Sequence, residues 1–230
     1  MGDDRRTSLI IDPPDGRLPP LADGVEPQVG SLDADLPGTR PVRIRSAGIG
    51  ADGPEDRGLA ERCLVGFNSG PPMMPSAYNN NMQLFQTPDY VVILNEMVHD
   101  ARIIPLDEQP LPPNGVRQWA GSSRGRWEGD TLVVETRNFS DKTASFEPSA
   151  LVAVGKGGTL RLTERFTRVG ERTLVYEYTV DDPSTYARPF TAAVPMRRSD
   201  VPLFEYACHE GNYGMVNALS GARAAERPAP

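Results

Sequence analysis

Long apolar runs and clusters of positive charge are both missing from this sequence. No stretch approaches the roughly 18 apolar residues that a membrane-spanning helix needs, and basic residues never stand more than two in succession. The formal net charge is −7 at pH 7, whereas nucleic acids and anionic membranes attract concentrated Lys and Arg. We therefore expect neither nucleic acid nor membrane as a partner, and the sequence makes no prediction of an oligomeric state.

An export signal is also missing from the first residues. Residues 1–4 (MGDD) are acidic where a signal peptide begins basic. We interpret the chain as the mature form of a protein, with Met1 as an added start.

Cysteine, histidine and the familiar catalytic motifs are scarce. The two cysteines, Cys63 and Cys208, form no C-x₂-C pair, and the sequence alone leaves open whether they are bridged or are two buried thiols. There is no G-x-S-x-G elbow, no Walker loop and no G-x-G-x-x-G after a strand. The glycine-rich residues 155–158 precede a strand rather than a helix, which argues against a phosphate cradle. We predict no cofactor.

What is present is a succession of short β-rich segments separated by turns, in a chain with 22 glycines and 23 prolines. Eight or nine such strands usually close into a barrel or pack as a sandwich, because open edges invite aggregation. We therefore predict an all-β fold, an antiparallel meander closed into a lipocalin-like barrel, with an extended N-terminal arm and a short C-terminal helix. The expected strands cover residues 82–87, 90–97, 101–106, 123–127, 131–136, 160–168, 173–180, 190–197 and 203–208.

The chain is expected to divide into three parts. Residues 1–53 are rich in Pro, Gly and Asp and read as an extended arm, with a short strand near residues 9–11. Residues 54–225 form the single β-barrel domain, and residues 226–230 form a disordered tail. The pattern-free loop at residues 66–81 is long enough to suggest that it covers a site.

Carboxylates stand on strand faces that are otherwise apolar. Because side chains alternate along a strand, Glu164 shares a face with leucine and phenylalanine, and Glu96 and Glu210 stand on similar faces. Burying a carboxylate is costly unless it is paired or used. We predict Glu96, Glu164 and Glu210, together with His99, as catalytic residues for proton transfer. For each acid the alternative is a structural ion pair, with candidate partners Arg102, Arg188 and Arg197.

A second group of residues is predicted to bind the substrate by hydrogen bonding or stacking: Tyr78, Arg102, Trp119, Lys142, Tyr206 and His209. A metal held by both histidines and neighbouring acids is chemically reasonable, but it requires a spatial convergence that no sequence shows. We expect no metal.

The predicted function is a cofactor-free enzyme that performs acid/base chemistry on a small, largely apolar molecule in the barrel cavity. The reaction would be that of an isomerase, lyase, cyclase or hydrolase. One alternative is a lipocalin-like binding protein that uses the same cavity without catalysis. The other is a structural or interaction domain in which every buried acid is paired.

Several segments resemble a large group of exported bacterial proteins with no established activity, numerous in acidobacteria and sphingomonads. The resemblance covers about residues 54–215 and implies a periplasmic or secreted location, which favours a Cys63–Cys208 disulfide. It implies no reaction. The segments that carry it are residues 86–94 (QTPDYVVIL), 125–136 (GRWEGDTLVVET), 139–143 (FSDKT), 163–166 (TERF) and 180–183 (VDDP).

Overall fold

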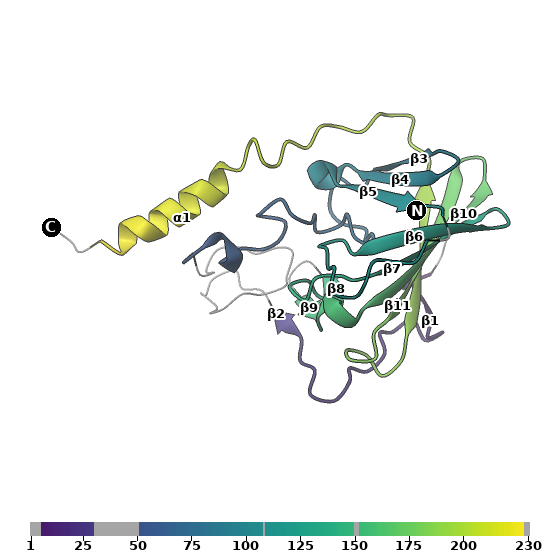
Figure 1. Cartoon of the computed structure of the whole chain (residues 1–230), viewed down its shortest axis with the longest axis horizontal. Coiled ribbons are helices and arrows are strands. Elements are labelled where there is room, and N and C mark those ends of the chain that lie inside the picture. The colour runs from purple at the N-terminus through teal and green to yellow at the C-terminus, as the bar shows by residue number, and fades with distance from the viewer. Residues whose placement is uncertain (1–5, 30–50, 108, 150–151, 228–230) are drawn as a thin grey trace.

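A six-stranded antiparallel sheet is the largest element of the computed structural model, which describes residues 6–29, 51–107, 109–149 and 152–227 (Figure 1). Its strand order is β1-β12-β11-β10-β7-β6. Two hairpins, β6–β7 and β10–β11, form where β-rich runs flank a tight turn, and Gly129 supplies the left-handed residue of the first turn at φ +59°. The strands are β1 (Ile10–Asp12), β6 (Ser122–Glu128), β7 (Thr131–Arg137), β10 (Arg161–Gly170), β11 (Thr173–Asp181) and β12 (Phe190–Arg197).

Two three-stranded antiparallel sheets complete the β structure, in the orders β3-β4-β5 and β2-β9-β8. The mostly β, antiparallel character expected from the sequence is therefore confirmed. In the part of the chain that the structure describes, no sheet has its first strand hydrogen-bonded to its last, so the expected closed barrel is not observed. These strands are β2 (Gln28–Val29), β3 (Met82–Gln86), β4 (Tyr90–Asn95), β5 (Ala101–Pro105), β8 (Phe146–Ser149) and β9 (Val152–Val154).

Three single-turn 3-10 helices lie in the connections: η1 (Pro54–Asp56), η2 (Met97–His99) and η3 (Gly157–Thr159). η2 follows directly on β4, so the strand expected over residues 90–97 ends two residues early, at Asn95. The strand expected at residues 203–208 does not form either. There the backbone bonds to side chains instead of a ladder, with Phe204 N donating to Glu96 and Tyr206 O facing His99.

The described part of the expected N-terminal arm adds short strands to two sheets. β1 pairs with β12, which confirms a strand near residues 9–11, and β2 pairs with β9. Residues 1–5 and 30–50 of that arm, and residues 228–230 of the expected tail, lie outside the described residues.

A group of neighbouring aromatic side chains lies in the core. Ring centroids of neighbouring pairs lie 4.9 to 6.3 Å apart, within the range in which aromatic pairs add stability beyond simple burial. They come from β8, β10, β11, β12 and the turn before β12: Phe146, Phe166, Tyr176, Tyr178, Tyr186 and Phe190. Much of the interior is thus filled by the chain's own side chains.

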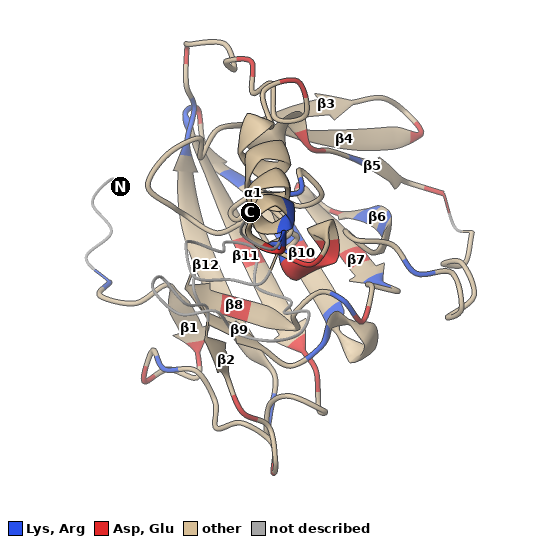
Figure 2. Cartoon of the chain, turned by 90° about the vertical axis from the view of Figure 1, so that its left-hand side faces the viewer, with Lys and Arg blue, Asp and Glu red and all other residues tan. Residues whose placement is uncertain are grey.

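The C-terminal helix α1 (Tyr213–Ala225) forms as expected and extends away from the sheets (Figure 1). None of its residues is buried. A disulfide between Cys63 and Cys208, with Cα atoms 5.9 Å apart, links the segment just before α1 to the segment that follows η1. Such a bond is compatible with an exported protein. No helix of the described residues is long and apolar enough to cross a membrane. Figure 2 shows basic and acidic residues interspersed over strands and loops.

Candidate functional site

Glu164 on β10 is fully buried, and its carboxylate accepts hydrogen bonds from two side chains. Arg102 on β5 donates through both terminal nitrogens, with Nη2 lying 2.9 Å from Oε1, and Tyr176 Oη donates to Oε1 at 2.8 Å. Tyr176 Oη in turn accepts from the backbone N–H of Met73, in the 66–81 loop. The acid thus joins β5, β11 and the loop to β10. This arrangement matches the alternative considered for each acid, a structural ion pair, and Arg102 is the partner.

Electrostatics keep the guanidinium of Arg102 charged. Burial lowers the pKa of Arg102, but the charge of Glu164 and its hydrogen bonds outweigh that effect, so the pKa lies above its usual value. Burial, reinforced by the charge of Glu164, raises the pKa of Tyr176 well above its usual value. The phenol therefore stays protonated and donates to the carboxylate. Glu164 has no free face for a substrate, and nothing in its surroundings favours a catalytic role over a structural one.

Glu96 is also buried, but it lies at the start of η2 rather than on a strand face. Its carboxylate accepts from the amides of Asn79 and Asn81, the latter at 2.9 Å, and from Phe204 N at 3.4 Å. Burial raises the pKa of Glu96, but these hydrogen bonds outweigh it and hold the pKa below its usual value. The carboxylate therefore stays ionised and fastens the 66–81 loop and the 203–208 segment to the turn after β4.

His99 is the predicted catalytic residue with the most unusual backbone. Val98 and His99 adopt φ values of +62° and +44°, a left-handed region that side chains with a Cβ seldom occupy and a β-branched residue avoids most. The exposed ring places Nδ1 2.6 Å from the carbonyl oxygen of Tyr206. Because a carbonyl can only accept, Nδ1 carries a proton, and Nε2 is the nitrogen left to accept one.

Tyr78 and Tyr206 lie in the same region. Burial, together with an electrostatic contribution from Tyr78, raises the pKa of Tyr206. Tyr78 is exposed and meets Phe67 edge to face, with ring centroids 5.4 Å apart. The structure therefore brings together Glu96, His99, Tyr78 and Tyr206 beside the 66–81 loop.

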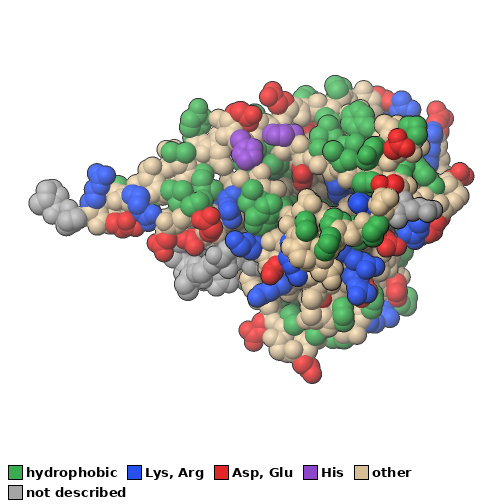
Figure 3. Space-filling view, viewed as in Figure 1, with side chains coloured by type: hydrophobic (Ala, Val, Ile, Leu, Met, Phe, Trp, Pro, Cys, Tyr) green, Lys and Arg blue, Asp and Glu red, His purple; other side chains and the backbone are tan. Residues whose placement is uncertain are grey.

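The remaining predicted residues are dispersed. His209 and Glu210 are exposed in the turn between the disulfide and α1. The prediction that Glu210 lies on a core-type strand face is therefore wrong, because the strand expected at residues 203–208 does not form. Trp119 lies under the guanidinium of Arg62, 5.9 Å from the ring centroid, and Lys142 is exposed. Both histidine side chains are visible on the face shown in Figure 3. Within the described ranges, no three His, Cys, Asp or Glu residues lie close enough to hold a metal ion.

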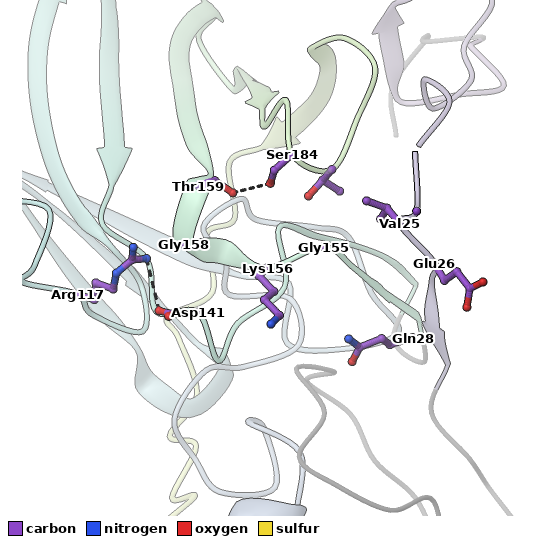
Figure 4. Close-up of a pocket in the computed structure, with 12 residues that line it drawn as sticks. Val25, Glu26, Gln28, Arg117, Asp141, Gly155, Lys156, Gly158, Thr159 and Ser184 are labelled. Carbon is purple, nitrogen blue, oxygen red and sulfur yellow. Dashed lines mark hydrogen bonds and ion pairs between the residues drawn. The ribbon is translucent and has the colours of Figure 1, made fainter. Parts of the chain in front are cut away.

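An open pocket of about 480 Å³, which the sequence did not suggest, is lined by residues around β2, β9 and η3 (Figure 4). This lies within the usual range for ligand sites, about 300–1,000 Å³. Its walls come from β2 and the segment before it, from the β5–β6 and β7–β8 connections, from η3 and the β9–η3 connection, and from the turn that follows β11. The polar lining residues are Glu26, Gln28, Arg117, Asp141, Lys156, Thr159, Ser184 and Thr185, and Gly24, Val25, Gly155 and Gly158 complete the wall.

Asp182 organises one wall of this pocket from beneath. Its buried carboxylate accepts from Ser184 N at 3.1 Å, from Ser184 Oγ at 2.7 Å and from Thr185 Oγ1 at 2.7 Å. Burial raises the pKa of Asp182, but hydrogen bonds from surrounding hydroxyl groups outweigh it and hold the pKa below its usual value. The charge is therefore kept, and it fixes the direction of the hydroxyl groups around it.

The cations of the pocket differ in how they are paired. Arg117 donates to Phe139 O at 3.0 Å and lies 3.4 Å from Asp141, so its charge is largely compensated. Lys156 is exposed and, among the described residues, forms no ion pair. Gly155 allows close packing beside it: φ is +65°, and a Cβ there would collide with the side chain of Thr185.

Two features of the sequence belong to this pocket, although neither predicted it. The run 182–185 (DPST) is typical of a turn in which an Asp side chain bonds the backbone two residues on. The glycine-rich residues 155–158 also stood out, but only a phosphate cradle was considered for them. Nothing local indicates that the two segments meet.

Comparisons with protein-family models, with curated proteins and with solved structures found no match. The functional argument therefore depends on the geometry of this chain alone.

Proposed function

We propose that this chain is a small-molecule binding protein whose ligand site is the open pocket around Lys156. The observation that carries the proposal is the ammonium group of Lys156, which has no ion-pair partner among the described residues although Arg117 beside it is paired. A ligand with an anionic group supplies that partner. The ligand is accordingly small, polar and negatively charged, rather than the largely apolar molecule expected from the sequence.

The location of the buried acids supports this choice. Glu164 is bound by Arg102 and Tyr176, and Glu96 by two asparagine amides. Neither acid has a free face for chemistry inside the molecule, where aromatic side chains fill much of the space. The proposal therefore does not include a lipocalin-like barrel with an interior ligand.

We place the protein in the periplasm or outside the cell. The support is the disulfide between Cys63 and Cys208, since such bonds persist in oxidising compartments and are rare in the cytosol. The resemblance to exported bacterial proteins agrees with this location. A pocket open to solvent suits a ligand taken up from the surroundings.

The test compares two lysine variants by calorimetric titration with a panel of small carboxylates: D-glucuronate, succinate and cyclohexanecarboxylate. Lys156→Met removes the unpaired charge, and Lys142→Met is the matched control because Lys142 is exposed but does not line the pocket. We expect at least one carboxylate to bind the wild type and the control, and to lose about tenfold or more in affinity in Lys156→Met. Equal affinities in the two variants, or no binding by any carboxylate, would contradict the proposal.

Acid/base catalysis at His99 is a second candidate function, favoured by one observation. The hydrogen bond from Nδ1 to Tyr206 O fixes the tautomer and leaves Nε2 as the accepting nitrogen, as a general base requires. Hydrolysis of p-nitrophenyl acetate can be compared in wild type, His99→Gln and His209→Gln. A rate lost in His99→Gln and kept in His209→Gln supports the candidate, and equal rates in all three proteins contradict it.

A further inference from the structure

We infer that the ligand of the pocket is a hydroxylated carboxylate of the sugar-acid type. The inference rests on the proposed function, because it names the class of molecule that the same pocket takes. It follows from which groups receive the hydrogen bonds that the hydroxyl groups of the pocket wall donate.

Each hydroxyl group of Ser and Thr has one proton to donate. The proton of Ser184 goes to the carboxylate of Asp182, at 2.7 Å, and so does that of Thr185. Thr159 Oγ1 lies 2.7 Å from Ser184 Oγ. Ser184 has already used its only proton, and Thr159 also hydrogen-bonds to Asp182, so the proton of Thr159 goes either to Ser184 Oγ or to that carboxylate. All three hydroxyl protons are therefore directed into the protein.

The wall thus presents acceptors to the pocket. Thr159 and Ser184 are exposed, and each oxygen keeps at least one lone pair after these internal bonds. A lone pair facing a ligand is satisfied by an O–H or N–H group. The ligand therefore carries hydrogen-bond donors on the side that meets Thr159 and Ser184.

Lys156 sets the other requirement. Figure 4 shows its side chain extending into the open space of the pocket, between Asp141 and Gln28, whereas the carboxylate of Glu26 points away from it. A negative group on the ligand pairs with this ammonium. Hydroxyl donors on one side and a carboxylate on the other are the features of a sugar acid, and the pocket volume of about 480 Å³ suits a ligand of this size.

Other ligand classes meet only part of this description. A neutral sugar supplies donors but leaves Lys156 unpaired, and inorganic phosphate or an alkyl carboxylate pairs with Lys156 but brings few or no donors for the wall. An amino acid brings both charges, but the carboxylate of Glu26 that would best receive its ammonium points out of the pocket (Figure 4).

The experiment uses three matched probes in calorimetric titrations: D-glucuronate, cyclohexanecarboxylate and D-glucose. Cyclohexanecarboxylate keeps the six-membered ring and the carboxylate but has no hydroxyl group, and D-glucose keeps the hydroxyl groups but has no carboxylate. We expect D-glucuronate to bind at least about tenfold more tightly than either, because each partial probe leaves polar groups of the pocket unsatisfied.

A variant of Thr159 tests whether the hydroxyl oxygens of the pocket wall contribute to the binding of D-glucuronate. Thr159→Val keeps the shape but removes the accepting oxygen, so it should weaken D-glucuronate several-fold and leave cyclohexanecarboxylate unchanged. Thr173→Val, at an exposed position on β11 outside the pocket, is the control. Unfolding midpoints of both variants show whether each has kept its fold.

The outcomes separate the inference from the proposed function. If cyclohexanecarboxylate binds as tightly as D-glucuronate through Lys156, the pocket is a carboxylate site but the sugar-acid inference is wrong. If D-glucose binds as tightly as D-glucuronate, the role given to Lys156 is wrong. If no probe binds, the inference fails, and if succinate does not bind either, the proposed function fails with it.

Discussion

Replacing Glu164 by glutamine removes a buried negative charge while nearly keeping the shape of the side chain. The carboxylate is fully buried and receives both terminal nitrogens of Arg102 and the hydroxyl of Tyr176. In Glu164→Gln one of these oxygens becomes an NH₂ group, and Arg102, whose side chain is only 10% exposed, is left without a counter-charge. Removing one partner of a buried pair costs about 3–5 kcal/mol. That is a large share of the roughly 5–15 kcal/mol by which most domains are stable.

Urea unfolding followed by tryptophan fluorescence measures this effect through the change in unfolding free energy. The matched control is Glu135→Gln, because Glu135 forms an exposed pair with Arg126 at 2.8 Å, where an ion pair contributes about 0–1 kcal/mol. The double variant Arg102→Met/Glu164→Leu removes both charges and should recover much of the lost stability.

The structural role given to Glu164 is refuted if Glu164→Gln costs no more stability than Glu135→Gln. A stable Glu164→Gln protein that had lost a measurable activity would instead restore the catalytic role expected from the sequence.

Three further predictions follow from particular contacts. Asp182→Asn should destabilise the protein most above about pH 4, the unfolded-state pKa of Asp. Because the folded-state pKa of Asp182 is lowered, its contribution is present above that pH and is lost as the pH falls through the folded value, so urea midpoints of wild type and variant should converge in acid. Gly155→Ala should lower the unfolding free energy by clearly more than Gly129→Ala, since both glycines have φ near +60° but only at Gly155 does the new Cβ meet a side chain; equal losses would contradict this. Cys63→Ser/Cys208→Ser should cost up to about 5 kcal/mol on the chain-entropy model for a loop of 145 residues, and an unchanged urea midpoint would show that the bond does not stabilise the fold.

Local patterns predicted much of the β structure because strand alternation and tight turns depend on residues that are close together in the sequence. Alternation and tight-turn residues located the β6–β7 and β10–β11 hairpins, and the buried face of β10 was correctly assigned to Glu164. Arg102 was among its candidate partners. The disulfide followed from the resemblance to exported proteins rather than from the spacing of two cysteines.

The errors arise where distant contacts override the local pattern. The run from Tyr90 to Val98 alternates like a strand, but the backbone of Val98 and His99 adopts positive φ values. A β-branched residue such as valine rarely takes this left-handed conformation, so the sequence did not suggest it. The 203–208 segment alternates too, yet it bonds to side chains of the turn after β4. The expected register of Glu96 and Glu210 was wrong for these reasons.

The pocket escaped prediction because it is assembled from separate parts of the chain. Arg117, Asp141, Lys156 and Ser184 come from four different connections, and the residue that orders them, Asp182, lies beneath the surface. Each segment alone is typical of an ordinary turn. Only the fold shows that they meet.

The most direct test of the central claim, that the pocket around Lys156 binds a ligand, is NMR spectroscopy of protein methylated on lysine with carbon-13. Lys142 and Lys156 are the only lysines in the sequence, so their methyl signals are easily distinguished with the two Met variants. Titration with D-glucuronate should shift the Lys156 signal to saturation and leave the Lys142 signal in place. A Lys156 signal that stays unchanged with D-glucuronate, succinate and cyclohexanecarboxylate alike, or that moves no more than the signal of Lys142, would contradict the account.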